Sequence, residues 1–119
     1  MPPGDCNPLA QDCRELAPHE SFTMIKEKKP GGCILIDVRT SREYTESRIT
    51  GAMNIDFFSP SFRTQVEQLN HNTPCIVYCL KGNRGRKAME LMKENGFMEV
   101  YNISGGITGW KESGLPTEP

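Results

Sequence analysis

Four short apolar runs, separated by segments with helical periodicity, limit the folds open to this chain. The runs cover residues 33–38, 52–55, 75–79 and 100–103. They are continuous rather than alternating, which is typical of strands buried on both faces of a parallel sheet. A weaker strand signal lies at residues 12–16. We therefore expect a sheet whose strands are hidden from solvent on both sides.

The intervals between the runs have helical patterns. We expect helices over residues 19–29, 41–46, 59–70, 84–95 and 107–113. The first ends at a Pro-Gly-Gly sequence and the fourth stops at Gly96, which are ordinary helix terminators. Strands that alternate with helices predict an α/β fold with a mostly parallel sheet.

Length and charge restrict the classes of protein. A chain of 119 residues fits one domain, which we place at residues 11–117 behind a flexible tail at residues 1–10. Fourteen Lys and Arg against fifteen Asp and Glu give a net charge of −1, which argues against a nucleic-acid or membrane-surface partner. The first 13 residues have neither a basic segment nor an apolar core, so we expect no secretory signal and predict a cytoplasmic protein.

Cysteine usage suits a reducing compartment. The chain contains five cysteines, Cys6, Cys13, Cys33, Cys75 and Cys79. Their number is odd, no C-x-x-C spacing occurs and only two histidines are present, so no metal site is expected. We expect Cys6 and Cys13 to lie in the flexible N-terminal segment, and Cys33 and Cys75 to be plain buried thiols.

The basic loop at residues 79–87 is the most informative segment. Cys79 closes a buried run, and ligands of parallel sheets bind beyond the carboxyl ends of strands. Gly82, Asn83 and Gly85 tolerate positive φ, so the loop can turn successive N–H groups inward as an anion nest. The following helix adds the positive end of its dipole. We expect Cys79 to be a thiolate nucleophile in an anion-binding pocket; the alternative is a buried strand-end cysteine before a solvated basic helix.

The spacing of the loop bears on the anion. Four of the seven residues from Lys81 to Lys87 are basic. Protein tyrosine phosphatases place an Arg after Cys and five intervening residues, so that its guanidinium grips phosphate with two hydrogen bonds. Here that position is Gly85, while Arg84 comes one residue early and Arg86 one residue late. The spacing disfavours a phosphatase or arsenate reductase, and the smaller loop suits one extra sulfur on Cys79, a persulfide.

The pattern Cys79-x-x-Gly82-x-Arg84 resembles the active-site loop of the rhodanese family. Residues 37–55 and 101–110 resemble two further signatures of that family, and the resemblance spans residues 16–115. It implies an α/β rhodanese-like fold with a mostly parallel five-stranded sheet flanked by helices on both faces. Two positions depart from the pattern. Arg48 replaces the usual His, which we expect to affect packing or surface charge, and Gly85 replaces a small hydroxyl residue, which removes one donor to a persulfide.

The resemblance implies a sulfurtransferase that needs no cofactor or metal. Cys79 would take sulfane sulfur from a small anionic donor such as thiosulfate. An acceptor, either cyanide, a low-molecular-weight thiol or a protein thiol, would then remove it in a ping-pong cycle. The persulfide would be held by backbone N–H groups of the loop residues Leu80, Lys81, Gly82, Asn83, Arg84 and Gly85.

Other expectations concern residues around the loop. Lys81 and Arg84 would attract the donor. Asp37 and Arg39 either shape the pocket rim or form a structural pair. We expect Trp110 to pack in the core or against the C-terminal segment; the alternative is that it stacks over the pocket mouth. The alternative function is a sulfur-relay or binding module that passes persulfide sulfur to a protein partner with little thiosulfate turnover. Its basic rim would then dock an acidic partner.

Overall fold

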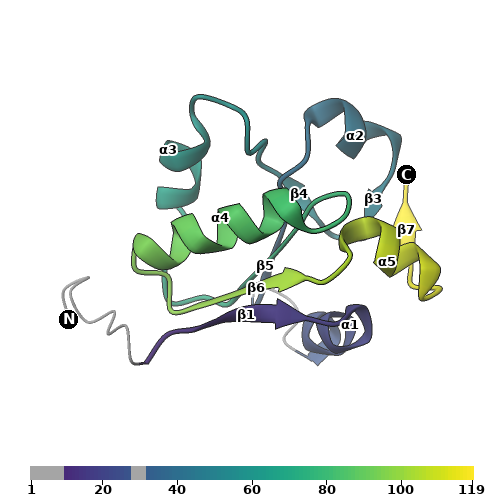
Figure 1. Ribbon diagram of the computed structural model, residues 1–119, viewed down its shortest axis with the longest axis horizontal. Coiled ribbons are helices and arrows are strands. Elements are labelled where there is room, and N and C mark those ends of the chain that lie inside the picture. The colour runs from purple at the N-terminus through teal and green to yellow at the C-terminus, as the bar shows by residue number, and fades with distance from the viewer. Residues whose placement is uncertain (1–9, 28–31) are drawn as a thin grey trace.

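Five parallel strands form the central sheet of the protein, whose computed structural model describes residues 10–27 and 32–119 (Figure 1). The strands are β1 (Asp12–Leu16), β2 (Ile34–Asp37), β4 (Met53–Asn54), β5 (Cys75–Tyr78) and β6 (Glu99–Ile103). Their order is β1-β6-β5-β2-β4, and every neighbouring pair is parallel. This confirms the predicted sheet, including the weakly signalled strand at residues 12–16.

Helices cover both faces of the sheet, as predicted. They are α1 (Pro18–Glu27), α2 (Ser41–Glu46), α3 (Phe62–Glu67), α4 (Asn83–Glu94) and α5 (Gly106–Glu112). Successive strand side chains point to opposite faces. Ile36 and Val77 pack in one apolar cluster with side chains of α3 and α4, whereas Leu35 and Ile76 pack in another with side chains of α1 and α5. Burial on both faces explains why the strands read as continuous apolar runs.

Trp110 of α5 packs in the core, as expected. Its side chain is 1% exposed, and its ring meets that of Phe22 edge to face. Its indole Nε1 donates a hydrogen bond to the carbonyl oxygen of Pro116, 2.8 Å away. This contact joins α5 to the C-terminal segment.

The boundaries of several elements differ from the prediction, most by a residue or two. The helix expected over residues 59–70 is only α3, because Ser59 and Ser61 hydrogen-bond to one another in a turn around Pro60. The loop helix α4 begins one residue earlier than expected, at Asn83. The strand expected over residues 52–55 is limited to β4. The last two residues of the helix expected over 19–29 lie outside the described residues.

A second, two-stranded sheet was not predicted. The strands β3 (Arg48–Ile49) and β7 (Thr117–Glu118) pair antiparallel. Arg48 lies over the ring of Tyr44, and its Nε is 3.3 Å from Oε1 of Glu118. Arg48 therefore anchors the C-terminal strand to α2.

The expected place of Cys13 was wrong. Cys13 lies in β1, pairs with Val100 of β6, and packs against the apolar cluster under α4. Cys6 and most of the expected flexible tail lie outside the described residues. Within residues 10–27 and 32–119, no helix is long and apolar enough to cross a membrane.

Candidate active site

A pocket opens where β5 ends and α4 begins. It has a volume of about 210 Å³ and is lined by Cys79, Leu80, Lys81, Asn83 and Arg84. The structure thus brings together five of the seven loop residues expected at the site. The other two, Gly82 and Gly85, lie in the same loop and in the first turn of α4 but do not line the pocket.

The sulfur of Cys79 is buried and receives a backbone hydrogen bond. The residue is 2% exposed, and the N–H of Gly82 donates to its Sγ at 3.0 Å. Gly82 has a φ of +118°, which favours glycine. It also caps the N-terminus of α4, whose positive dipole end faces the loop. The bond and the dipole both favour negative charge on the sulfur.

The first two carbonyl groups of the loop accept hydrogen bonds from backbone N–H groups of α5. The N–H of Ile107 donates to the carbonyl oxygen of Cys79 at 2.9 Å, and the N–H of Thr108 donates to that of Leu80 at 3.1 Å. A trans peptide places its C=O and N–H on opposite sides, and the described residues contain no cis peptide. The N–H groups of Leu80 and Lys81 therefore point away from α5. Both N–H groups thus lie on the side of the loop opposite α5, as an anion nest requires.

Gly106 allows α5 to approach the loop this closely. A Cβ at Gly106 would lie 2.4 Å from the carbonyl oxygen of Cys79 and 2.5 Å from that of Leu80. Its φ of +60° also disfavours other residues. Gly106, within the resembling segment at residues 101–110, is therefore part of the support of the loop.

Arg84 is held in an ion pair with Glu43 of α2. Its Nη1 is 2.9 Å from Oε1 of Glu43, and its Nη2 is 3.3 Å from Oε2. Hydrogen bonds from Arg84, and then from the backbone and hydroxyl of Thr40, lower the pKa of Glu43 to about 2. Glu43 thus offsets much of the positive charge of Arg84. Lys81, in contrast, has no ion-pair partner among the described residues.

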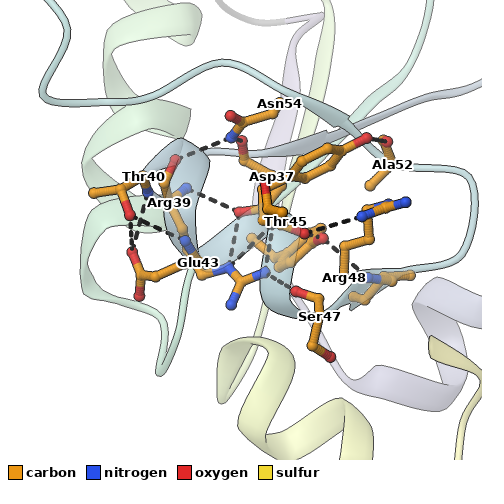
Figure 2. Close-up of polar contacts among 12 residues, drawn as sticks. Asp37, Arg39, Thr40, Glu43, Thr45, Ser47, Arg48, Ala52 and Asn54 are labelled. Atoms are coloured by element: carbon orange, nitrogen blue, oxygen red, sulfur yellow. Dashed lines mark hydrogen bonds and ion pairs between the residues drawn. The ribbon is translucent and has the colours of Figure 1, made fainter. Parts of the chain in front are cut away.

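Asp37 and Arg39 form a buried ion pair (Figure 2). Neither residue lines the pocket. Nε and Nη2 of Arg39 donate to the carboxylate of Asp37, and Nη2 also donates to the carbonyl oxygen of Ser47. The hydroxyl of Tyr78 donates to Asp37 at 3.0 Å. Burial, followed by the charge of Asp37, raises the pKa of Tyr78 well above its ordinary value, so the hydroxyl stays protonated. The geometry matches the structural alternative rather than a pocket rim.

Other cysteines differ in their surroundings from Cys79. Burial raises the pKa of the Cys75 thiol to about 12, so it is a poor nucleophile at neutral pH. Burial also raises the pKa of Cys13. No group of three or more His, Cys, Asp and Glu side chains suited to a metal ion occurs within the described part of the chain.

Sequence reasoning missed two polar side chains near the loop. Glu43 is recognisable as the last residue of a capping box that begins at Thr40, but its ion pair with Arg84 joins residues 41 positions apart. Asn102 of β6 donates to the carbonyl oxygen of Gly82 at 3.1 Å. It lies within an apolar strand, so no local pattern marks it.

Comparisons with known proteins agree with this geometry. The family model described as rhodanese-like domain matches residues 20–113. The thiosulfate sulfurtransferase GlpE of Actinobacillus pleuropneumoniae serotype 5b (strain L20) is 30% identical over 110 residues, which are 92% of this chain and 97% of the relative. The protein of the same name from Haemophilus influenzae (strain ATCC 51907 / DSM 11121 / KW20 / Rd) is 28% identical over 88% of this chain and 94% of its own length.

Solved structures show the same fold. A rhodanese-related protein from Thermoplasma volcanium has a TM-score of 0.76 and 26% identity, over 88% of this chain and 97% of that chain. A rhodanese-like domain from Anabaena sp. has the same TM-score and identity, over 87% of this chain and 77% of that chain. The chain therefore belongs to the rhodanese-like family and is a rhodanese-type sulfurtransferase.

Proposed function

We propose that Cys79 carries sulfane sulfur as a persulfide between an anionic donor and a thiophilic acceptor. The thiolate of Cys79 attacks the outer sulfur of thiosulfate and forms a new S–S bond. The S–S bond within thiosulfate breaks, and its electron pair leaves on sulfite. The observation that carries the proposal is the N–H of Gly82 at 3.0 Å from Sγ, in a loop whose neighbouring carbonyl groups are held from behind.

The second half-reaction restores the thiolate. A thiolate or cyanide attacks the outer sulfur of the persulfide, and the electron pair of the broken S–S bond returns to Cys79. Lys81 supports this chemistry because it lines the pocket without an ion-pair partner among the described residues, and its charge favours an anionic donor and departing sulfite. A reducing compartment such as the cytoplasm suits the cycle, because a free thiolate is the attacking group.

Intact mass spectrometry after incubation with thiosulfate tests the proposal. We expect the wild-type protein to gain one sulfur atom that cyanide removes, and Cys79→Ser to gain none. Cys75→Ser is the matched control, because Cys75 begins β5, the strand that leads to Cys79, but does not line the pocket and has a raised pKa. It should load like the wild type. Loading of Cys79→Ser, or failure of every sulfane donor to modify the wild type, would refute the persulfide on Cys79.

A sulfur relay to a protein partner is the second candidate. Two exposed apolar side chains favour it. Leu80 lines the pocket and is 41% exposed, and Phe58 is 67% exposed with its ring 5.8 Å from the guanidinium of Arg84. Steady-state turnover separates the candidates. Fast thiosulfate:cyanide turnover supports the enzyme on small molecules, whereas slow turnover with ready transfer to a protein thiol supports the relay.

A further inference from the structure

Asn102 lies behind the active-site loop with its side chain completely buried. Its Nδ2 donates to the carbonyl oxygen of Gly82 at 3.1 Å and to the two carboxylate oxygens of Glu15 at 3.2 and 3.0 Å. A reversed amide would bring Oδ1 against three oxygen acceptors, so these contacts fix its orientation. Asn102 therefore links β1 to the loop through a defined set of hydrogen bonds.

The oxygen of the same amide faces Gly85. Oδ1 lies 2.1 Å from the position that a Cβ on Gly85 would take. Among the described residues, Oδ1 of Asn102 is the one buried side-chain oxygen or nitrogen atom that has no hydrogen-bond partner. A buried amide oxygen without a partner is unfavourable, so the bonds of Nδ2 outweigh this cost. The missing side chain at Gly85 makes room for Asn102.

The bond to Gly82 controls the peptide between Gly82 and Asn83. Because a trans peptide places its C=O and N–H on opposite sides, Asn102 and the N–H of Arg86, which hold this carbonyl, turn the N–H of Asn83 away from themselves. Asn83 lines the pocket. The same bond also restrains Gly82, whose own N–H reaches Sγ of Cys79.

We infer that Asn102 is a positioning residue for Cys79. It completes from β6 the support that α5 gives to the peptides after Cys79 and Leu80, and it holds Gly82 where the N–H of Gly82 bonds Sγ of Cys79. This inference rests on the proposed function. Asn102 lies outside the loop, and stabilisation of the thiolate and persulfide of Cys79 depends on it.

The pH profile of Cys79 alkylation by iodoacetamide, read on the peptide that contains Cys79, tests the inference. Asn102→Ala removes the side chain, and Asn102→Asp keeps its shape but replaces the donor by an acceptor. In both variants we expect the midpoint of the profile to rise by about one pH unit, which corresponds to a tenfold loss of thiolate stabilisation. The charged groups around Cys79, namely Lys81 of the loop, Arg84 of α4 and Glu43 of α2, are unchanged in both variants. Asn102→Asp adds a carboxylate whose negative charge also raises the midpoint, so Asn102→Ala isolates the loss of the hydrogen bond.

Sulfur loading provides a second readout. In single-turnover reactions with thiosulfate, we expect the maximal loading rate of both variants to fall about tenfold, as for the loss of a hydrogen bond to a charged group. The thiosulfate concentration for half-maximal loading should change little, because Lys81 is retained. A merely structural defect would not separate these two quantities.

Tyr101→Phe is the matched control. Tyr101 is the preceding residue of β6, is equally buried, and hydrogen-bonds to Asp12 and Glu99 rather than to the loop. Its alkylation midpoint and loading should equal those of the wild type. If Asn102→Ala does not fold, Glu15→Ala removes the partly exposed carboxylate that orients the amide. This change also removes a negative charge and the ion pair with Arg86, which opposes a rise of the midpoint, so the readout is the loading rate, which we expect to fall by less than in the Asn102 variants.

The outcomes separate the inference from the proposed function. Wild-type midpoints and loading rates in the folded Asn102 variants, a wild-type loading rate in Glu15→Ala where those variants do not fold, or equal shifts in Tyr101→Phe, would overturn the role of Asn102. A wild-type protein that shows the alkylation profile but accepts sulfur from no donor would instead refute the proposed function.

Discussion

Gly85 shows how one missing side chain constrains its neighbours. Helix propensity alone predicts that Gly85→Ala in the first turn of α4 stabilises the protein by up to about 1 kcal/mol. The structure reverses this sign, because the new Cβ overlaps Oδ1 of Asn102, which three hydrogen-bond contacts of Nδ2 hold in place. We expect Gly85→Ala and Gly85→Ser to destabilise the protein by about 1–3 kcal/mol in urea denaturation.

The control is the same Gly85→Ser substitution made in the Asn102→Ala variant. In Asn102→Ala the space is vacant, so the loss caused by Gly85→Ser should be much smaller than in the wild type. Ser and Ala should behave alike, because the overlap comes from the Cβ. An additive double variant would contradict the overlap, and faster sulfur loading by Gly85→Ser than by Gly85→Ala would show that the family's hydroxyl acts as a donor here.

The lowered pKa of Glu43 affects the stability of the fold at low pH. The pKa of Glu43 is about 2 in the folded protein against an ordinary 4.5. Its ionised form therefore stabilises the fold fully above about pH 4.5, and this contribution is lost as the pH falls towards 2. We expect Glu43→Gln to be less stable than the wild type at pH 7 by on the order of 1 kcal/mol. The free energies of unfolding of the two proteins should converge as the pH approaches 2.

Urea midpoints measured from pH 7 to pH 2.5 check this prediction. Glu46→Gln is the matched control on the same helix, because its ion pair with Arg42 is 3.6 Å long and largely exposed. That variant should follow the wild type at every pH. A constant gap between Glu43→Gln and the wild type across the range would show that the ion pair with Arg84 does not account for the effect.

At the scale of elements, the approach of α5 to the loop depends on Gly106. In Gly106→Ala the Cβ would lie 2.4 Å from the carbonyl oxygen of Cys79, so α5 or the loop must move. We expect a loss of stability of about 1–3 kcal/mol and slower persulfide loading, because the bonds from Ile107 and Thr108 are disturbed.

Gly114→Ala separates steric overlap from backbone strain. Gly114 has a φ of +76°, comparable to the +60° of Gly106, but a Cβ there meets no atom within 4 Å. We expect Gly114→Ala to lose stability through strain alone, about 1 kcal/mol, and to load sulfur normally. Equal loading by both alanine variants would mean that α5 does not support the loop.

The elements also show what a sequence can reveal. Strands buried on both faces leave continuous apolar runs, so the sheet of this protein was predictable. The loop was predictable as well, because Cys79, Gly82 and Arg84 lie within six successive residues. The sheet of β3 and β7 was not, since two-residue strands show no periodicity and pair Arg48 with Glu118 across 70 positions.

The remaining parts of the site depend on contacts that no local pattern encodes. Glu43 belongs to a local capping box and also binds Arg84 from another element. Asn102 reads as one more position of an apolar strand, although its amide contacts both Glu15 and Gly82. Polar residues with tertiary partners inside regular elements were therefore the ones that sequence reasoning missed.

At the scale of the whole molecule, the net charge is −1, whereas Lys81 places a positive charge at the pocket. Uniformly spread, the net charge would slightly repel an anionic donor. Salt screens charges beyond about 8 Å at physiological ionic strength, so a donor near the pocket experiences Lys81 rather than the average. We therefore expect the second-order rate of sulfur loading by thiosulfate to fall as ionic strength rises, as for attraction between opposite charges.

Two lysine variants locate the source of this attraction. Lys81→Ala should load more slowly at low salt and lose most of its salt dependence. Lys93→Ala removes the same charge near the other end of α4, about 15 Å along the helix from Asn83, and should keep the wild-type salt dependence. Alkylation by uncharged iodoacetamide should depend little on salt in all three proteins. A similar salt dependence in Lys81→Ala and the wild type would assign the attraction to charges other than Lys81, with Arg84 as the next candidate despite its ion pair with Glu43.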